Sequence, residues 1–201
     1  LNKDASLGDS RTAVFIQCVG SREPERPYCS RVCCTHSLES ALELKRLNPE
    51  GDVYILYRDL RSYGERETLY QEARKAGVIF IRFDLENKPQ VKLENGVLQV
   101  TVIDHVLQRP ITMKPELIVL ATAILPNESE AVAQFFKVPV NEDGFFFEAH
   151  AKLRPVDFAT DGVFLCGLAH YPKPIDECIA QAQAAASRAA TLLARESIQF
   201  S

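Results

Sequence analysis

The sequence predicts an α/β protein built around a parallel β-sheet. Between residues 13 and 83, short apolar runs rich in β-formers alternate with amphipathic helical stretches. This alternation is typical of strand–helix–strand units that cross over a parallel sheet. The pair Asn95-Gly96, with apolar residues on both sides, is a strong hairpin signal. The expected fold is therefore a parallel sheet with a β-hairpin or meander attached.

Hydrophobic periodicity and turn residues place the elements of the first half of the chain. Leu38 and Ala41 fall on one helical stripe, which predicts a helix that packs on the sheet, and Ser30 is the expected cap of this helix. We expect strands at 13–19, 52–57 and 78–83, helices at 30–47 and 65–76, hairpin strands at 91–93 and 97–103, and a closing strand at 117–122.

The composition changes along the chain predict a short lead-in and two folded parts. The first residues are polar and lack periodicity, and Pro126-Asn127 interrupts the second half after an apolar run. The expected parts are a flexible lead-in at 1–10, a nucleotide-binding-like domain at 11–124, and a second unit at 125–201 with a strand at 162–167 and an alanine-rich helix at 177–194.

The bulk composition argues against several classes of function. The chain has 201 residues, and its formal net charge of −4 does not suggest a protein that binds nucleic acid or a membrane surface. No apolar run approaches the roughly 18 residues that span a bilayer, and the start lacks the apolar core of a signal peptide. We therefore expect a cytoplasmic protein without membrane insertion, in which thiols stay reduced.

Four of the six cysteines cluster around the end of the first strand and the start of the first helix. Cys18, Cys29, Cys33 and Cys34 have the spacing C-x10-C-x3-C-C. The carboxyl edge of a parallel sheet is a usual place for a cofactor, and a helix N-terminus favours thiolates. Three interpretations stay open: a [4Fe–4S] cluster on all four cysteines, a structural zinc ion, and a redox disulfide with the remaining thiols in the core.

The usual signal of a dinucleotide site is missing. No G-x-G-x-x-G follows the first strand, and the loop that carries the cysteines occupies that position. This argues against a nicotinamide cofactor in the first domain. Asp59, Arg61 and Tyr63, which follow the second strand, are therefore expected to form a structural turn. Cys166 and Cys178 are expected to be packed core thiols.

Several longer runs resemble one family. They are VFIQCVGSR at 14–22, PYCSRVCC at 27–34, GFFFEAHAKLRPVD at 144–157, and GVFLCG at 162–167 with PKPIDECIAQAQAAASRAA at 172–190. Together they resemble the A subunit of heterodisulfide reductase and its relatives, which include quinone-interacting oxidoreductase flavoproteins. The resemblance implies a Rossmann-like, thioredoxin-reductase-like body with FAD, and a [4Fe–4S] cluster on Cys18, Cys29, Cys33 and Cys34.

The resemblance also gives the second unit a role. It implies that residues 125–201 form the C-terminal half of an FAD-binding domain, in which the N-terminus of the last helix points at the flavin. Gly167, Leu168, Lys173 and Ile175 are the candidates for the flavin side. The glycine-rich FAD fingerprint of the family does not occur in this sequence, so the flavin site is incomplete here and a fragment of a longer protein is expected.

The resemblance implies a function in electron transfer. The chain would pass electrons between FAD and the iron–sulfur cluster in a multi-subunit heterodisulfide reductase-like or quinone-interacting complex, with no acid–base catalytic residue of its own. Other subunits of that complex are the expected partners, and a homodimer is a further expectation. The alternatives are a pyridine-nucleotide-dependent disulfide reductase fragment with a Cys29–Cys33 disulfide, and a zinc-stabilised interaction domain.

Overall fold

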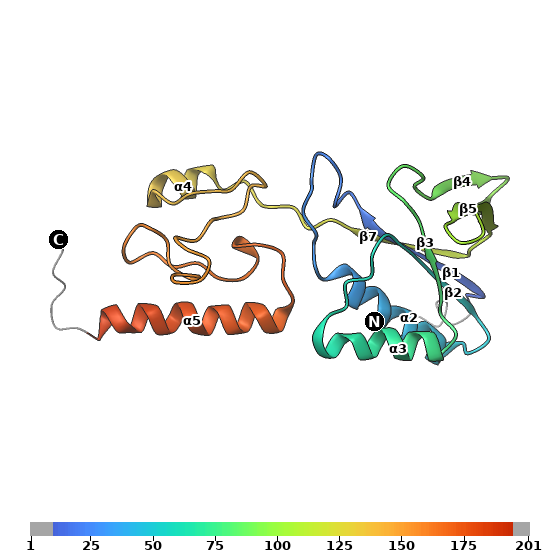
Figure 1. The fold of residues 1–201 in the computed structure, drawn as a ribbon, viewed down its shortest axis with the longest axis horizontal. Coiled ribbons are helices and arrows are strands. Elements are labelled where there is room, and N and C mark those ends of the chain that lie inside the picture. Colours follow the sequence, from blue (N-terminus) through green and yellow to red (C-terminus); the bar gives the residue numbers. More distant parts are fainter. Residues whose placement is uncertain (1–9, 195–201) are drawn as a thin grey trace. The chain divides into compact units, whose positions relative to one another are not determined.

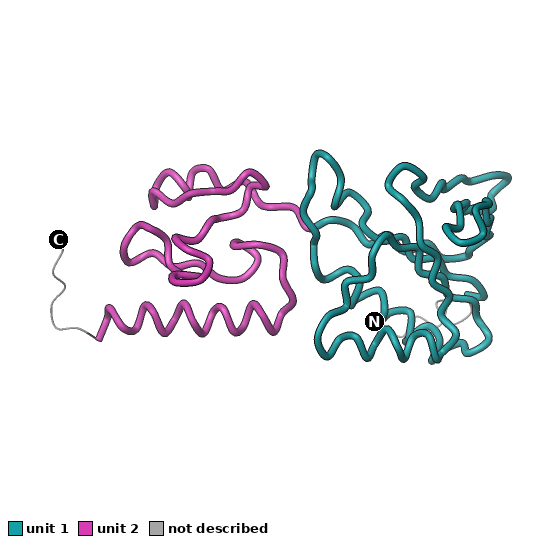
Figure 2. The backbone as a smooth tube through the Cα atoms, viewed as in Figure 1, with its two compact units in different colours: residues 1–123 teal, residues 124–201 magenta. Residues whose placement is uncertain are grey.

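The computed structural model describes residues 10–194 and divides the chain into two compact units, 1–123 and 124–201 (Figures 1 and 2). Apart from Ser10, the predicted lead-in lies outside the described residues. None of the helices within the described range is long and apolar enough to cross a membrane. Each unit has its own set of elements and its own core.

A four-stranded parallel sheet forms the centre of the first unit. Its order is β3-β2-β1-β7, and each neighbouring pair is parallel. The apolar run of the first strand is buried on both faces of the sheet, as is typical of a central strand in a parallel sheet. The strands are β1 (Thr12–Val19), β2 (Asp52–Tyr57), β3 (Ile79–Arg82) and β7 (Leu117–Thr122). The predicted α/β fold with a parallel sheet is therefore confirmed.

Two helices cover one face of this sheet (Figure 1). They are α2 (Cys33–Leu47) and α3 (Glu67–Lys75), the latter preceded by a short 3-10 turn at Gly64–Arg66. Leu38 and Ala41 of α2 are fully buried against Phe15 of β1, as the helical stripe predicts. This packing sets the start of α2 above the carboxyl end of β1.

The opposite face of the sheet is covered by an antiparallel meander. Its strands are β4 (Gln90–Glu94), β5 (Val97–Asp104) and β6 (Arg109–Met113), in the order β4-β5-β6. The hairpin predicted at Asn95-Gly96 is confirmed, because these two residues join β4 to β5 with φ of +52° and +78°. Strand β6 was missed, because it is short and contains Pro110, which weakens a strand signal.

The predicted cap of the first helix is wrong. Helix α2 begins at Cys33 rather than near Ser30, and its cap residue is Val32, which makes no side-chain cap bond. Ser30 is buried, and its carbonyl accepts a 2.7 Å hydrogen bond from the Val32 N–H. The chain therefore turns once more before the helix starts, and Cys33 and Cys34 become its first two residues.

The second unit has little regular structure besides two helices, α4 (Glu130–Phe136) and α5 (Ile175–Leu193). Its core contains Val138, Phe158 and Leu165. The strand predicted at 162–167 is not formed. This stretch makes one isolated bridge, between Asp157 and Phe164, because no neighbouring strand among the described residues extends the ladder.

Two further expectations for the second unit need correction. Helix α5 begins two residues before the predicted start at Glu177. Cys166 is exposed rather than packed in a core, and Cys178 is half-buried. The missing strand explains the exposure of Cys166. Neighbouring strands would cover a residue in a sheet, whereas Cys166 lies in an open loop.

Candidate functional site

The four clustered cysteines lie where strand β1 ends and helix α2 begins. Cys18 is the penultimate residue of β1, Cys33 and Cys34 open α2, and Cys29 lies in the loop between them. Cys18 and Cys34 are buried, and Cys29 and Cys33 are half-buried. Because β1 is a central strand, this thiol site lies at the carboxyl edge of the parallel sheet, where such sheets place their ligands.

The backbone bends sharply at the thiol site. The ladder between β1 and β7 is interrupted between Ile16 and Val19, and Cys18 has a φ of +60°. Arg22 and Arg31 also have left-handed φ values, of +57° and +62°. Such a conformation costs a non-glycine residue about 1 kcal/mol or more, and it concentrates at functional sites. The chain turns back at these bends, and Cys18 and Cys29 come near enough to Cys33 and Cys34 to affect them electrostatically.

Hydrogen-bond donors surround the sulfur atoms. The Arg31 N–H donates to Cys29 Sγ at 3.3 Å, and the Arg61 N–H donates to Cys34 Sγ at 3.4 Å. Arg22 Nη1 lies 4.0 Å from Cys18 Sγ. Donors of this kind stabilise thiolates that carry negative charge, and they are the contacts that tune metal–thiolate centres.

Burial shapes the protonation of two of these thiols. Burial raises the pKa of Cys34 to about 11, although the Arg61 N–H acts in the opposite direction. Burial also raises the pKa of Cys33, and the neighbouring Cys29 and Cys18 add to this effect. Positive charge within the site, such as a bound metal ion would supply, would favour the ionised forms of Cys33 and Cys34.

The donor set suits some metal groups better than others. No three His, Cys, Asp or Glu side chains between residues 10 and 194 lie close enough to bind one metal ion. A cuboid cluster has four separate corners, so it suits thiols that come from separate segments. All six cysteines are free thiols in the described part of the chain. Four thiols from three segments, with N–H donors on two of the sulfur atoms, are a donor set of the type that an iron–sulfur cluster uses.

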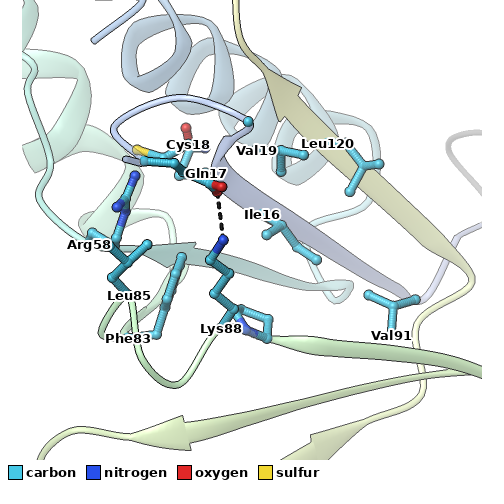
Figure 3. Close-up of a pocket in the computed structure, with 13 residues that line it drawn as sticks. Ile16, Gln17, Cys18, Val19, Arg58, Phe83, Leu85, Lys88, Val91 and Leu120 are labelled. Atoms are coloured by element: carbon cyan, nitrogen blue, oxygen red, sulfur yellow. Dashed lines mark ion pairs between the residues drawn. The ribbon is translucent and has the colours of Figure 1, made fainter. Parts of the chain in front are cut away.

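A pocket of about 290 Å³ adjoins the thiol site (Figure 3). Cys18 and Gln17 line it together with mostly apolar residues such as Ile16, Phe83 and Leu120. Gln17 is almost completely buried, and neither polar atom of its amide has a hydrogen-bond partner among the described residues. Buried amides normally have partners, so this amide, next to Cys18, is available to a group bound beside the sheet.

In the second unit, the structure joins two of the four candidate flavin residues in one polar network. Lys173 is buried, and its Nζ lies 2.6 Å from Gln181 Oε1 and 3.1 Å from His170 Nδ1. The same Gln181 oxygen accepts the Gly167 N–H at 2.9 Å. Leu168 and Ile175, in contrast, are exposed. The network therefore fixes the loop before α5 and leaves its apolar residues on the surface.

Hydrogen bonding determines the tautomer of His170. Its Nδ1 faces two donors, Lys173 Nζ and Gln181 Nε2, so Nδ1 is the acceptor. Its Nε2 then carries the hydrogen and donates it to Glu148 at 2.8 Å. Sequence reasoning did not group Glu148 or Gln181 with Lys173. The available signal for Gln181 was that it is a polar residue in an alanine-rich helix, eight positions after Lys173.

Comparisons with known proteins agree with the resemblance seen in the sequence. No family model matches the chain. It is 40% identical over 188 residues to an iron–sulfur A subunit of the CoB–CoM heterodisulfide reductase of Methanopyrus kandleri. It is 39% identical over 197 residues to the A subunit of the H2:CoB–CoM heterodisulfide,ferredoxin reductase of Methanothermobacter thermautotrophicus. These matches take in 90% and 94% of this chain but only 28% and 29% of the two relatives.

Solved structures with a similar fold are flavoprotein reductases. The thioredoxin reductase of T. acidophilum has a TM-score of 0.57 at 14% identity, over 92% of this chain and 53% of its own. The enzyme of Lactococcus lactis has a TM-score of 0.56 at 16% identity, over 92% of this chain and 54% of its own. The fold therefore resembles that of about half of a thioredoxin reductase. The chain is a homologue of the heterodisulfide reductase A subunit over a segment that makes up less than a third of the relatives' length.

Proposed function

We propose that this chain is an electron-transfer part of a heterodisulfide reductase-like oxidoreductase. Cys18, Cys29, Cys33 and Cys34 hold a [4Fe–4S] cluster that works together with FAD. The observation that carries the proposal is the gathering of four thiols from three segments at the carboxyl edge of the sheet, with N–H donors on their sulfur atoms. Such a cluster, when bound, accepts and returns one electron at a time.

The residues around the thiols bind and shield the cluster. Cys18 and Cys34 are buried, so water has little access to their sulfur atoms. The Arg31 and Arg61 N–H groups donate to sulfur and stabilise negative charge there. The side chain of Ser30 hydrogen-bonds to Cys33, which lowers the pKa of that thiol against the effect of burial. No proton transfer by this chain is needed for its part in the reaction.

The second unit supplies one side of the flavin site in this proposal. Gly167 and Lys173 are held by Gln181, and Leu168 and Ile175 offer exposed apolar contacts beside the start of α5. The N-terminal end of a 19-residue helix favours negative charge on a reduced flavin. Since no G-x-G-x-x-G loop for the FAD pyrophosphate occurs in this sequence, these residues form only part of the site.

The names of the relatives support a role for this chain in a multi-subunit complex. Both relatives compared above are named as subunits of a heterodisulfide reductase. We propose that this chain, too, functions with other subunits of such a redox complex. A homodimer stays a prediction.

The experiment that tests the proposal is anaerobic purification followed by metal analysis. We expect four irons and four sulfides per chain, and a brown protein with a broad absorption near about 400 nm. One zinc per chain and no colour would replace the cluster with a structural ion. No metal after anaerobic reconstitution would favour a redox disulfide.

A pair of cysteine variants sharpens this test. Cys29→Ser should lose the absorption and most of the iron, because the variant lacks one of the four thiolates. Cys178→Ser is the matched control, since Cys178 lies in the second unit and outside the thiol site. If Cys178→Ser lost iron as readily as Cys29→Ser, the assignment of the four ligands would be wrong.

A further inference from the structure

The segment after strand β2 forms a wall of the thiol site. Arg58 donates from its guanidinium to the Ser21 carbonyl at 2.6 Å and to the Arg22 carbonyl at 2.7 Å. Arg26 donates in the same way to the Gly20 carbonyl at 2.7 Å. The bonds from Arg58 attach the loop that follows Cys18 to the end of β2. A dinucleotide-binding protein would use this edge for its ligand, whereas here the arginines bind the chain itself.

Asp59 holds the Arg22 guanidinium near the Cys18 sulfur. Its Oδ2 accepts a 2.5 Å hydrogen bond from Arg22 Nη2, while the other nitrogen of the same guanidinium, Nη1, lies 4.0 Å from Cys18 Sγ. The Arg22 side chain is only 18% exposed. Arg61 and Arg82 also lie near Asp59, at 3.9 and 3.7 Å. A carboxylate among three arginines holds one of them against the thiol site.

We propose that Arg22 is the charge that sets the reduction potential at the thiol site, and that Asp59 and Arg58 are the positioning residues that hold it there. This inference rests on the proposed iron–sulfur function. Reduction adds negative charge to a centre that already carries four thiolates. A partly buried cation next to one ligand sulfur stabilises the reduced form more than the oxidised form, because its field is poorly screened there.

The contacts of Arg22 indicate an electrostatic role rather than a structural role in holding the loop after Cys18. Arg58 already holds the loop through two carbonyls, so the Arg22 side chain is not needed for that purpose. Within the described part of the chain, the Arg22 guanidinium donates to no backbone carbonyl and instead bridges Asp59 and Cys18. Removing its charge should therefore change the potential more than the fold.

The experiment measures the midpoint potential of the anaerobically purified, iron-loaded chain. Arg22→Gln should shift the one-electron equilibrium roughly tenfold towards the oxidised form, which corresponds to about 59 mV. Arg22→Lys keeps the charge, so its one-electron equilibrium constant should lie within about twofold of the wild-type value. Arg82→Gln is the matched control: it removes a cation from the same carboxylate but has no sulfur contact, so its shift should be much smaller.

Asp59→Asn provides a second test, because its two possible effects on the potential have opposite signs. Loss of a negative charge alone would raise the potential, whereas release of Arg22 from Cys18 should lower it. We expect the potential to fall and the further effect of Arg22→Gln in this background to shrink. If Arg22→Gln takes up no iron, Asp59→Asn by itself decides the question.

The outcomes separate this inference from the proposed function. A wild-type chain that binds no iron contradicts the iron–sulfur function, and the role of Arg22 in setting a cluster potential falls with it. A chain with four irons whose potential is the same in Arg22→Gln keeps that function and overturns the role of Arg22. A potential that rises in Asp59→Asn overturns the positioning role of Asp59.

Discussion

Leu38 is the side chain that holds helix α2, and with it Cys33 and Cys34, on the sheet. It is fully buried among residues that include Phe15 and Ile55. Leu38→Ala should lower the free energy of unfolding by about 2–5 kcal/mol, because it removes buried methyl groups and leaves a cavity. Urea denaturation measures this. The exposed neighbour Glu39 is the control, since Glu39→Ala should change stability by less than about 0.5 kcal/mol. Equal losses in both variants would contradict the packing.

The ion pair of Glu23 and Lys88 at the pocket beside Cys18 predicts a pH effect (Figure 3). The hydrogen bond from Lys88 holds the pKa of Glu23 below its usual value. A depressed folded-state pKa means that the stabilisation is present above the unfolded pKa of about 4.3 and is lost as the pH falls through the folded value. The Lys88 side chain is about half exposed, so solvent screening limits the contribution of the pair to at most about 1 kcal/mol.

An NMR titration of Glu23 checks this effect. In Lys88→Met the pKa of Glu23 should move up towards about 4.3, although Arg58 and Arg26 still lower it somewhat. An unchanged pKa in Lys88→Met would show that the pair does not form in solution.

Among the secondary-structure elements, the meander depends on its first turn. Gly96 has a φ of +78°, and no atom lies within 4 Å of the position that a Cβ would take. Gly96→Ala should therefore destabilise the β4–β5 hairpin by about 1–2 kcal/mol through backbone strain alone. Asn95→Gly is the matched variant. Because Asn95 also has a positive φ, glycine should be tolerated there. Hydrogen exchange of the β4 and β5 amides measures the stability of the hairpin in both variants. Faster exchange in Asn95→Gly but not in Gly96→Ala would contradict the backbone-strain explanation.

The elements show how local sequence and tertiary context divide their influence. Strands β2 and β7 have the predicted bounds, because their apolar runs favour a strand whatever packs on them. The cap of α2 was predicted two residues too early, because Ser30 is buried beside the thiol site and Val32 takes the cap position. The predicted strand at 162–167 failed because a strand needs a neighbour, and periodicity alone does not supply one.

Considering the two units together, the iron of the proposed cluster should stabilise the first unit and not the second. The four thiols belong to residues 1–123, while the core of Val138, Phe158 and Leu165 in residues 124–201 contains none of them. Chelating the iron should increase hydrogen exchange around Cys18 and the start of α2, because metal binding is coupled to local folding. Exchange around Phe158 should stay the same. Faster exchange of both cores after chelation would contradict this division.

Local sequence patterns were enough to predict the parallel sheet, the hairpin and the set of clustered cysteines. Apolar runs, turn residues and cysteine spacing are local properties, and they point to the same fold whatever their partners. The resemblance of the longer motifs also pointed to the family that the comparisons support. The roles of the individual cysteines and of the flavin residues stay predictions.

Long-range packing, in contrast, selected the residues that surround the thiols. Arg22 and Asp59 are 37 positions apart, and Arg58 is equally far from the Ser21 carbonyl that it holds. They meet because the crossover through α2 brings the ends of the parallel strands β1 and β2 together. Likewise, Gln181 reaches Gly167 only once α5 has packed against the preceding loop. Polar contacts over such separations leave no periodic pattern in a single sequence, so the folded arrangement has to reveal them.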